Sequence, residues 1–303
     1  MRISRREFFR NLGIAAGAAV LVGREALAAE GVAPAKTANV IVCKGTNYKA
    51  LLARAFAKIG GLKKFVASGD RVLVKPNIAW DRKPEYAATT NPLVVAALVE
   101  LCYGAGAREV KVYDNPCVNC RRSYASSGIA DAARDAGAKV SYVDTALGKT
   151  VKIPRGVAVK SAKIYADVLA NDVIVNVPIA KDHSLTGLTL GMKNLMGILV
   201  ENRGRWHQQI NKKLVDLAQV ITPTLTVIDA TRILTANGPT GGDLRYVKRL
   251  DKIIVTEDVT AADAYAATLF GLEPTDVGVV KEARRRGFGT ADLARMAVST
   301  VEV

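Results

Sequence analysis

The chain has 303 residues, 50% of them hydrophobic, and a formal net charge of +15. This length is enough for one large domain or two small ones with a sizeable hydrophobic core. The lysines and arginines are scattered and aromatic residues do not interleave with them, which argues against nucleic-acid binding. A solvated basic surface is one interpretation of the charge, and an anionic small molecule or an anionic envelope surface as partner is the other.

The first 28 residues have the layout of an export signal. Arg5 and Arg6 are followed by an uncharged run at 12–22 and by small residues at 26–28, where a signal peptidase would cut. The arginine pair resembles the twin-arginine type, and the apolar run is shorter than the about 20 residues needed to span a bilayer. We therefore expect residues 1–28 to be a signal peptide that engages the twin-arginine export machinery. The mature protein would then be periplasmic or otherwise exported, with no stable membrane span after cleavage.

Strand and helix patterns alternate after a short linker at 29–38. The predicted strands are 39–43, 71–75, 110–113, 139–143, 172–177, 225–228 and 253–255. The predicted helices are 48–59, one that starts at 91–92, 129–135, a long helix after 178, 214–220 and 258–270. This alternation predicts a single α/β domain over 39–303, with a mostly parallel or mixed sheet flanked by helices in a Rossmann-like three-layer arrangement. Residues 149–170 interrupt the rhythm and predict a small β-hairpin insertion.

Two helix boundaries are marked by specific residues. Asn91 can accept a hydrogen bond from free backbone amides, and Pro92 at the first helical position has no amide N–H to leave unpaired. Asp258 is expected to cap a helix in the same way, and Gly271 is expected to close it.

Polar side chains follow several predicted strands. They are Lys75, Asn77, Asp114, Asn115, Asp144, 181–183, Asp229, Thr256 and Asp258. In open α/β sheets, ligands bind beyond the carboxyl ends of the strands, so a site is expected at this edge. A single Asp at such a position more often caps the next helix.

The segment 178–197 holds the densest set of candidate residues. On the predicted helix, apolar side chains occupy one side, and His183, Thr186, Lys193 and Asn194 occupy the other. We take His183, Lys181 and Lys193 as candidate catalytic residues, because lysines beside helix-start amides attract carboxylate or phosphate and histidine transfers protons near neutral pH. A solvated amphipathic helix is the alternative. It leaves unexplained three glycines in this segment, each of which costs about 1 kcal/mol in a helix.

Further candidates for ligand binding lie along the chain. They are Lys75, Asn77, Thr186, Asn194, His207, Gly241 and Gly242. His207 lies in a loop rich in basic residues, where a plain surface role is equally open. Gly241 and Gly242 belong to a turn whose consecutive amides could form an anion-binding nest, or a simple flexible turn.

The four cysteines fall into two groups. Cys43 and Cys102 lie in apolar segments and are expected in the core. Cys117 and Cys120 form a Cys-x-x-Cys pair, for which a local disulfide is favoured in an oxidising compartment. A metal or iron–sulfur role, or a redox or free thiol pair, is the alternative. The sequence identifies no particular cofactor.

Several motifs are shared with one known family. They are 72–77, 90–92, 104–107, 176–178, Lys181, 183–187, 193–197, His207, 227–229, 237–239 and 262–264. On these motifs the chain resembles the family called domain of unknown function 362 over 39–303. The resemblance implies an α/β domain that in some members is joined to ferredoxin-type iron–sulfur modules, and this sequence contains no such module. It points to the fold and to the site, and it implies no particular reaction.

Three hypotheses for function follow. The leading one is an exported enzyme or cofactor-binding protein that holds a small anionic molecule with Lys75, Lys181, Lys193 and His183. The second is a redox or metal-bearing accessory protein centred on Cys117 and Cys120. The third is a non-catalytic periplasmic binding protein.

Overall fold

The computed structural model describes residues 37–201 and 203–302. Within them, ten strands form one sheet in the order β12-β1-β11-β10-β7-β2-β3-β4, with β8 paired to β10 and β9 paired to β8. These strands are β1 (Ala38–Lys44), β2 (Arg71–Pro76), β3 (Glu109–Tyr113), β4 (Lys139–Ser141), β7 (Val173–Val177), β8 (Ile179–His183), β9 (Gly187–Thr189), β10 (Leu225–Leu234), β11 (Val247–Thr256) and β12 (Met296–Glu302). The run from β10 to β4 is parallel, whereas β11 is antiparallel to both of its neighbours. The predicted α/β class with a mixed, mostly parallel sheet is confirmed.

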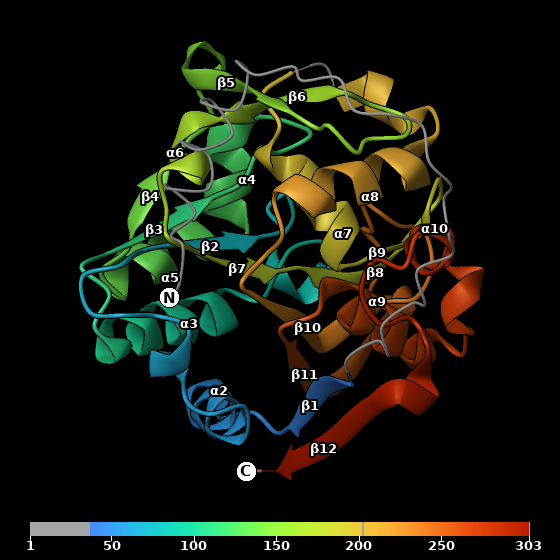
Figure 1. The fold of residues 1–303 in the computed structure, drawn as a ribbon. Coiled ribbons are helices and arrows are strands. Elements are labelled where there is room, and N and C mark those ends of the chain that lie inside the picture. The colour runs from blue at the N-terminus through green and yellow to red at the C-terminus, as the bar shows by residue number, and fades with distance from the viewer. Residues whose placement is uncertain (1–36, 202, 303) are drawn as a thin grey trace, which may run out of the picture.

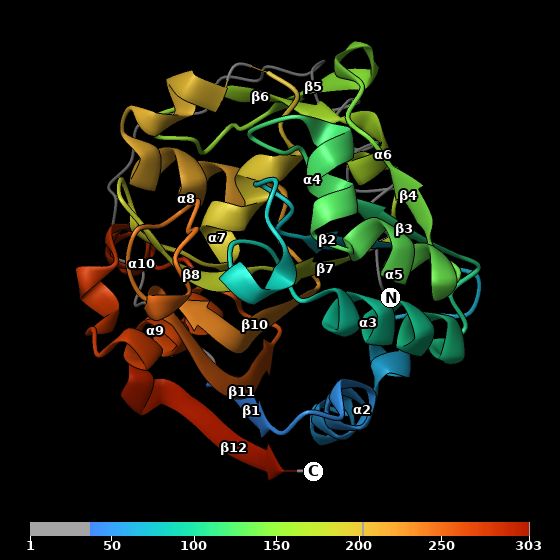
Figure 2. The ribbon, with the colours of Figure 1, turned by 180° about the vertical axis from the view of Figure 1, so that it is seen from behind.

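Helices cover both faces of the sheet (Figures 1 and 2). They are α2 (Tyr48–Lys58), α3 (Pro92–Ala105), α4 (Cys120–Ser126), α5 (Ile129–Asp135), α6 (Ala166–Leu169), α7 (Gly191–Asn194), α8 (Ile210–Val220), α9 (Val259–Ala267) and α10 (Gly278–Arg285). In β2, Val72 and Val74 belong to the core under α2, α3 and α5, whereas Leu73 belongs to the opposite core under α7 to α10. This alternation follows from the two-residue repeat of a strand, so the next residue on the Leu73 side is Lys75.

The predicted hairpin insertion is present as a separate two-stranded sheet. Strands β5 (Gly148–Lys152) and β6 (Ser161–Tyr165) pair antiparallel. Asp216 on α8 fastens the loop between them, because its carboxylate accepts hydrogen bonds from the backbone N–H groups of 157–159. The Tyr165 ring also stacks on Tyr113 at the end of β3, with 4.3 Å between ring centroids.

The predicted long helix after 178 is wrong. Residues 179–189 form the β8–β9 hairpin instead, and only the four residues of α7 and a 3₁₀ turn at Leu195–Ile198 are helical. Strand β8 is favoured because β10 and β9 pair with its backbone on both sides, and Gly187 takes a φ of +71° at the turn. A helix here would have left those neighbouring strand edges unpaired.

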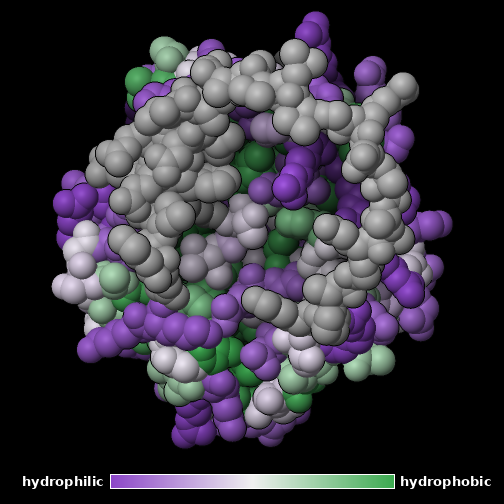
Figure 3. All heavy atoms as spheres, in the orientation of Figure 1, coloured by the Kyte–Doolittle hydropathy of each residue, from purple (hydrophilic) through white to green (hydrophobic). Residues whose placement is uncertain are grey.

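Two predicted helix starts are confirmed, whereas β10 and β11 extend well beyond the predicted strands at 225–228 and 253–255. Asn91 caps α3 by accepting from the Leu93 N–H, and Asp258 caps α9 by accepting from the Thr260 and Ala261 N–H groups. The sequence did not predict α4, α10 or β12. In Figure 3, the coloured surface of one face is hydrophilic around its rim, as the scattered basic residues predict.

The predicted signal peptide at 1–28 and most of the linker at 29–38 lie outside the described residues. Among the helices at 37–201 and 203–302, none combines the length and the apolar character that crossing a membrane requires.

Candidate functional site

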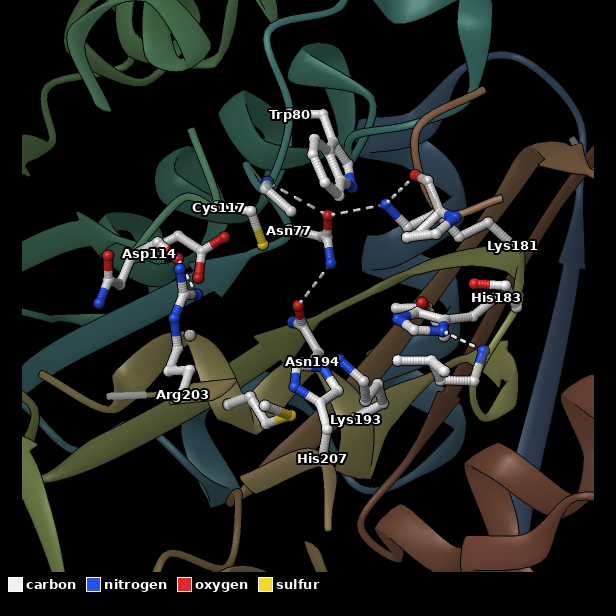
Figure 4. Close-up of a pocket in the computed structure, with 18 of the residues that line it drawn as sticks. Asn77, Trp80, Asp114, Cys117, Lys181, His183, Lys193, Asn194, Arg203 and His207 are labelled. Atoms are coloured by element: carbon white, nitrogen blue, oxygen red, sulfur yellow. Dashed lines mark hydrogen bonds between the residues drawn. The ribbon is translucent and has the colours of Figure 1, made fainter. Parts of the chain in front are cut away.

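A cavity of about 410 Å³ lies where the carboxyl ends of β2 and β3 meet the β8–β9 hairpin and α7. This is the edge at which open α/β sheets bind ligands. Residues distant in sequence share its wall, among them Asn77, Lys181, His183, Lys193 and His207, as Figure 4 shows. The structure therefore brings together most of the residues that the sequence analysis selected, although not on the predicted helix.

Lys75 and Asp114 form a buried ion pair beneath the cavity. Lys75 Nζ donates to Asp114 Oδ1 at 2.7 Å, and the two side chains are 0% and 3% exposed. Burial lowers the pKa of Lys75, and the neighbouring Asp114 carboxylate opposes that shift. Asp114 Oδ2 also accepts from the Ile78 N–H at 2.6 Å. The pair thus ties the chain after β2 to the end of β3.

Asn194 connects α7 to this floor. Its Oδ1 accepts from Lys75 Nζ at 3.2 Å and from Asn77 Nδ2 at 3.1 Å. Its Nδ2 donates to Asn176 Oδ1 on β7 at 2.9 Å. Because one amide bridges β2, β7 and α7, the residue that precedes Asn194 is held at the cavity wall.

Lys181 is 1% exposed and is held by neutral acceptors. Its Nζ donates to the Ala88 carbonyl at 2.6 Å, to the Pro239 carbonyl at 3.1 Å and to Asn77 Oδ1 at 3.3 Å. Three acceptors match the three N–H groups of an ammonium. Burial nevertheless lowers the pKa of Lys181 to about 7, since no carboxylate among the described residues bonds to it.

Lys193 is half-buried on the cavity wall. Neither a hydrogen bond nor an ion pair joins its Nζ to any residue between 37 and 302 that the structure describes. Burial lowers the pKa of Lys193 to about 8. A partly desolvated ammonium without a partner is costly, and an anion in the cavity would offset that cost.

His183 is 6% exposed, and its Nδ1 accepts from the Leu185 N–H at 3.1 Å. The neutral ring therefore carries its proton on Nε2. Burial, followed by the charges of Lys193 and Lys181, lowers the pKa of His183 to about 3. At neutral pH the side chain is thus an uncharged N–H donor.

Arg203 and His207 come from the segment before α8 and complete the rim. Arg203 donates to the carbonyls of Asn115 and Pro116, which ties this segment to the loop after β3. His207 is exposed, and partial burial, then the Lys193 charge, lowers its pKa.

A buried carboxylate supports α7 from the side away from the cavity. Asp263 on α9 accepts from the Gly191 N–H at 2.5 Å and from the Met192 N–H at 3.0 Å. Burial raises the pKa of Asp263 to about 7, and the two amide donors oppose that shift. A side chain at Gly191 would collide with Asp263, so this glycine permits a close approach between elements.

Four of the predicted ligand-binding residues do not line the cavity: Lys75, which lies beneath it, Thr186, Gly241 and Gly242. The Thr186 hydroxyl donates to the Leu188 carbonyl within the β8–β9 turn at 2.9 Å. Gly241 lies against the Tyr86 carbonyl, and Gly242 lies near the Arg82 guanidinium. The turn at 237–242 instead contributes Pro239, whose carbonyl holds Lys181.

The two cysteines of the Cys-x-x-Cys pair are free thiols in the structure. Cys117 is exposed and lines the cavity, whereas Cys120 begins α4 and packs against the core under α3 and α5. This arrangement differs from the favoured disulfide, because the start of α4 directs the two side chains to different surroundings. The described residues contain no group of three or more His, Cys, Asp or Glu side chains placed to hold a metal. A metal role for Cys117 and Cys120 therefore stays a prediction.

Sequence reasoning did not select several residues that line the cavity, among them Trp80, Thr189, Met196 and Arg203. The only signal for Arg203 is its place beside His207 in a basic loop. Nothing in the sequence around Trp80 marks it, because it lies in an irregular segment after β2.

Comparison with known proteins places this site in a family context. The family described as Domain of unknown function (DUF362) matches residues 72–268, which include the floor and most of the wall of the cavity. A relative, "Thylakoid-associated protein sll1697" from Synechocystis sp., is 28% identical over 238 residues, which are 76% of this chain and 72% of the relative. A solved structure, the lactate racemase apoprotein from Thermoanaerobacterium thermosaccharolyticum, is similar with a TM-score of 0.49 and 12% identity. That similarity covers 76% of this chain, which spans 56% of the racemase chain.

Proposed function

We propose that this chain, which belongs to the family described as Domain of unknown function (DUF362), binds a small anion in the cavity and acts on it as an enzyme or holds it as a cofactor. The observation that carries the proposal is the Lys193 ammonium in the cavity wall, which has no hydrogen-bond or ion-pair partner among residues 37–201 and 203–302. A positive charge that is partly removed from water and has no partner is stabilised by an anionic ligand.

The other charges around the cavity support the same ligand class. Lys181 and Arg203 also line it, and the carboxylate of Asp114 is already neutralised by Lys75. The field in the cavity is therefore positive, and low-dielectric walls concentrate such a field on an entering anion. Carboxylates and phosphates fit this requirement equally.

The uncharged side chains of the cavity would orient a bound anion. The Nε2–H of His183 is a donor, because Nδ1 is occupied by the Leu185 N–H. Trp80 and Met196 supply apolar wall. An organic anion would then place its charge toward Lys193 and Arg203 and its carbon atoms against Trp80 and Met196.

Thermal unfolding in the presence of different anions tests the proposal. Phosphate or citrate should raise the Tm of the wild-type protein above that in sodium chloride of equal ionic strength, because a ligand that binds only the folded state stabilises it. Lys193→Met should lose this increase. Lys149→Met, which removes an exposed lysine on β5, should keep it. An equal increase in Lys193→Met would mean that the anions bind elsewhere, and the proposal would be wrong.

Turnover and native mass spectrometry separate an enzyme from a binding protein. A resident cofactor should remain with the purified protein at one equivalent and be lost in Lys193→Met. A substrate or a transported solute would not remain bound in this way, and only a substrate would be converted.

We also propose export through the twin-arginine route, supported by Arg5, Arg6 and the segment 12–28. This route carries proteins that have already folded. A cofactor that the fold encloses could therefore be inserted before export.

A further inference from the structure

Cys117 is a reactive group in the cavity that anion binding alone does not use. Its backbone N–H donates to the Ala79 carbonyl at 2.9 Å and fixes the loop after β3. Its side chain lines the cavity, as a free thiol, without a hydrogen bond to any residue described at 37–201 or 203–302. Figure 4 shows its sulfur beside Asn77, on the side of the cavity where Asp114 lies.

The thiol shares the cavity with the two lysines. Cys117, Lys181 and Lys193 line one cavity of about 410 Å³, to which the loop after β3, strand β8 and helix α7 contribute them. An anion drawn to the lysines would lie within reach of the sulfur.

Thr189 is a second polar group on the cavity wall with which a ligand would form a hydrogen bond. Its residue is 3% exposed, and its Oγ1 has no hydrogen-bond partner in the part of the chain that the structure describes. Thr189 pairs with Lys181 in the β8–β9 register, so both side chains lie on the cavity face of the hairpin. Buried hydroxyls in folded proteins are nearly always paired, and a ligand oxygen in the cavity would supply the missing partner.

We propose that Cys117 is the nucleophile of this site and that its substrate is a small aldehyde or ketone that carries a carboxylate. The inference rests on the proposed anion-binding function. The Cys117 thiol gives its proton to the neutral amine of Lys193, and the sulfur attacks the carbonyl carbon and forms a C–S bond while the π electrons of the carbonyl move to its oxygen. The Lys193 ammonium then gives that oxygen the proton, so Lys193 ends as it began, the product is a hemithioacetal or hemithioketal, and no oxidant or reductant is needed.

Other residues of the cavity would stabilise the substrate in this reaction. The Nε2–H of His183 donates to the oxygen on which negative charge develops. Arg203 uses two of its nitrogens to hold the carbonyls of 115–116 and keeps other N–H groups for the substrate carboxylate. Cys120 does not line the cavity, and burial raises the pKa of its thiol.

Alkylation with a charged and an uncharged reagent tests the inference. Native protein is treated in parallel with iodoacetate and iodoacetamide, and the rates at Cys117 and Cys120 are followed by peptide mass mapping. The ratio of the iodoacetate rate to the iodoacetamide rate at Cys117 should exceed that of the urea-unfolded protein by about tenfold or more, because a positive cavity concentrates anions. The ratio at Cys120 should not rise, and Lys193→Met should remove the preference at Cys117.

Glyoxylate, an aldehyde that carries a carboxylate, tests the chemistry directly. Wild-type protein mixed with isotope-labelled glyoxylate should show the hemithioacetal carbon by NMR, and Cys117→Ser should not. Cys117 is exposed, so the serine variant should fold. If the wild type shows the anion-dependent Tm increase while the alkylation ratio equals that of unfolded protein, or no adduct forms, the inference is wrong and anion binding stands. If the Tm increase is itself absent, both proposals fail.

Discussion

Gly197 and Asp114 lie in direct contact, and this contact is possible only because residue 197 has no side chain. A Cβ at Gly197 would overlap Asp114 Oδ1 and would lie 2.7 Å from Lys75 Nζ. The buried ion pair beneath the cavity therefore depends on a glycine in the turn that follows α7. The Asn115 N–H also donates to the Gly197 carbonyl at 2.9 Å, so this backbone is fixed on both sides.

We expect Gly197→Ala to destabilise the protein. The added methyl group must push Asp114 or the turn aside, and overpacking of this kind costs about 1–3 kcal/mol. Gly104→Ala on α3 is the matched control, because a Cβ there meets no atom within 4 Å. In a helix that change should be neutral or stabilise by up to about 1 kcal/mol. Urea unfolding of the two variants measures both effects, and equal stabilities would contradict the stated role of Gly197.

The pH should have opposite effects on the stability of the free protein and on its affinity for anions. The pKa values of Lys181 and Lys193 lie at about 7 and about 8, below those of lysines in an unfolded chain. Between about pH 7 and pH 10.4 the unfolded state binds more protons, so stability should rise with pH in this window. Anion binding should weaken over the same window, because the two side chains lose their charge.

Urea unfolding and phosphate titration at several pH values measure the two trends. Lys193→Met should reduce the slope of each, because it removes one titrating group. Phosphate affinity that stays constant from pH 7 to 10 would contradict a role for these lysines in binding.

His183 should make the protein sensitive to acid. Burial, followed by the Lys193 and Lys181 charges, lowers its pKa to about 3. Between about pH 6.5 and pH 3 the unfolded chain therefore takes up a proton that the folded state does not, and stability should fall as the pH falls. His183→Gln should remove this difference of one proton between the unfolded and the folded state. Stability should then fall less steeply as the pH is lowered.

NMR titration of the ring protons provides the direct check. The chain has only two histidines, so a His207→Gln variant leaves a single ring to follow. The His183 ring should remain neutral down to about pH 4. A midpoint near the ordinary value of about 6.5 would show that the ring is more solvated than its position implies.

The sequence predicted which residues form the site better than it predicted their backbone. Lys75 and Asn77 could be placed because polar residues after buried strands lie at one sheet edge. Lys181, His183 and Lys193 were selected as polar residues among apolar ones, in a segment predicted to be a helix although it begins as a strand. Strand β8 brings Lys181 and His183 to one side, and α7 brings Lys193 to the same cavity. Whether this segment forms a helix or a strand depends on β10, whose edge pairs with β8. Because β10 is distant in sequence, local patterns around β8 do not reveal this pairing.

Cys117 and Arg203 show a second limit of sequence reasoning. Spacing and compartment favoured a bond between Cys117 and Cys120, but the helix start at Cys120 separates their surroundings. Arg203 is held at the cavity by hydrogen bonds to two backbone carbonyls of the loop after β3, a loop that lies far from Arg203 in the sequence. Contacts of this kind depend on the assembled fold, so composition and periodicity do not reveal them.

The last prediction concerns the segment that precedes the described residues. Replacing Arg5 and Arg6 together by lysine keeps the charge and the apolar run at 12–22, so a signal read only for charge and hydrophobicity should still work. The twin-arginine machinery reads the arginine pair itself, and the variant should therefore accumulate as precursor in the cytoplasm. Cell fractionation followed by immunoblotting measures the precursor and mature forms. Export that continues in this variant and stops only when the general secretory route is blocked would assign the signal to that other route, and folding would then have to take place after export.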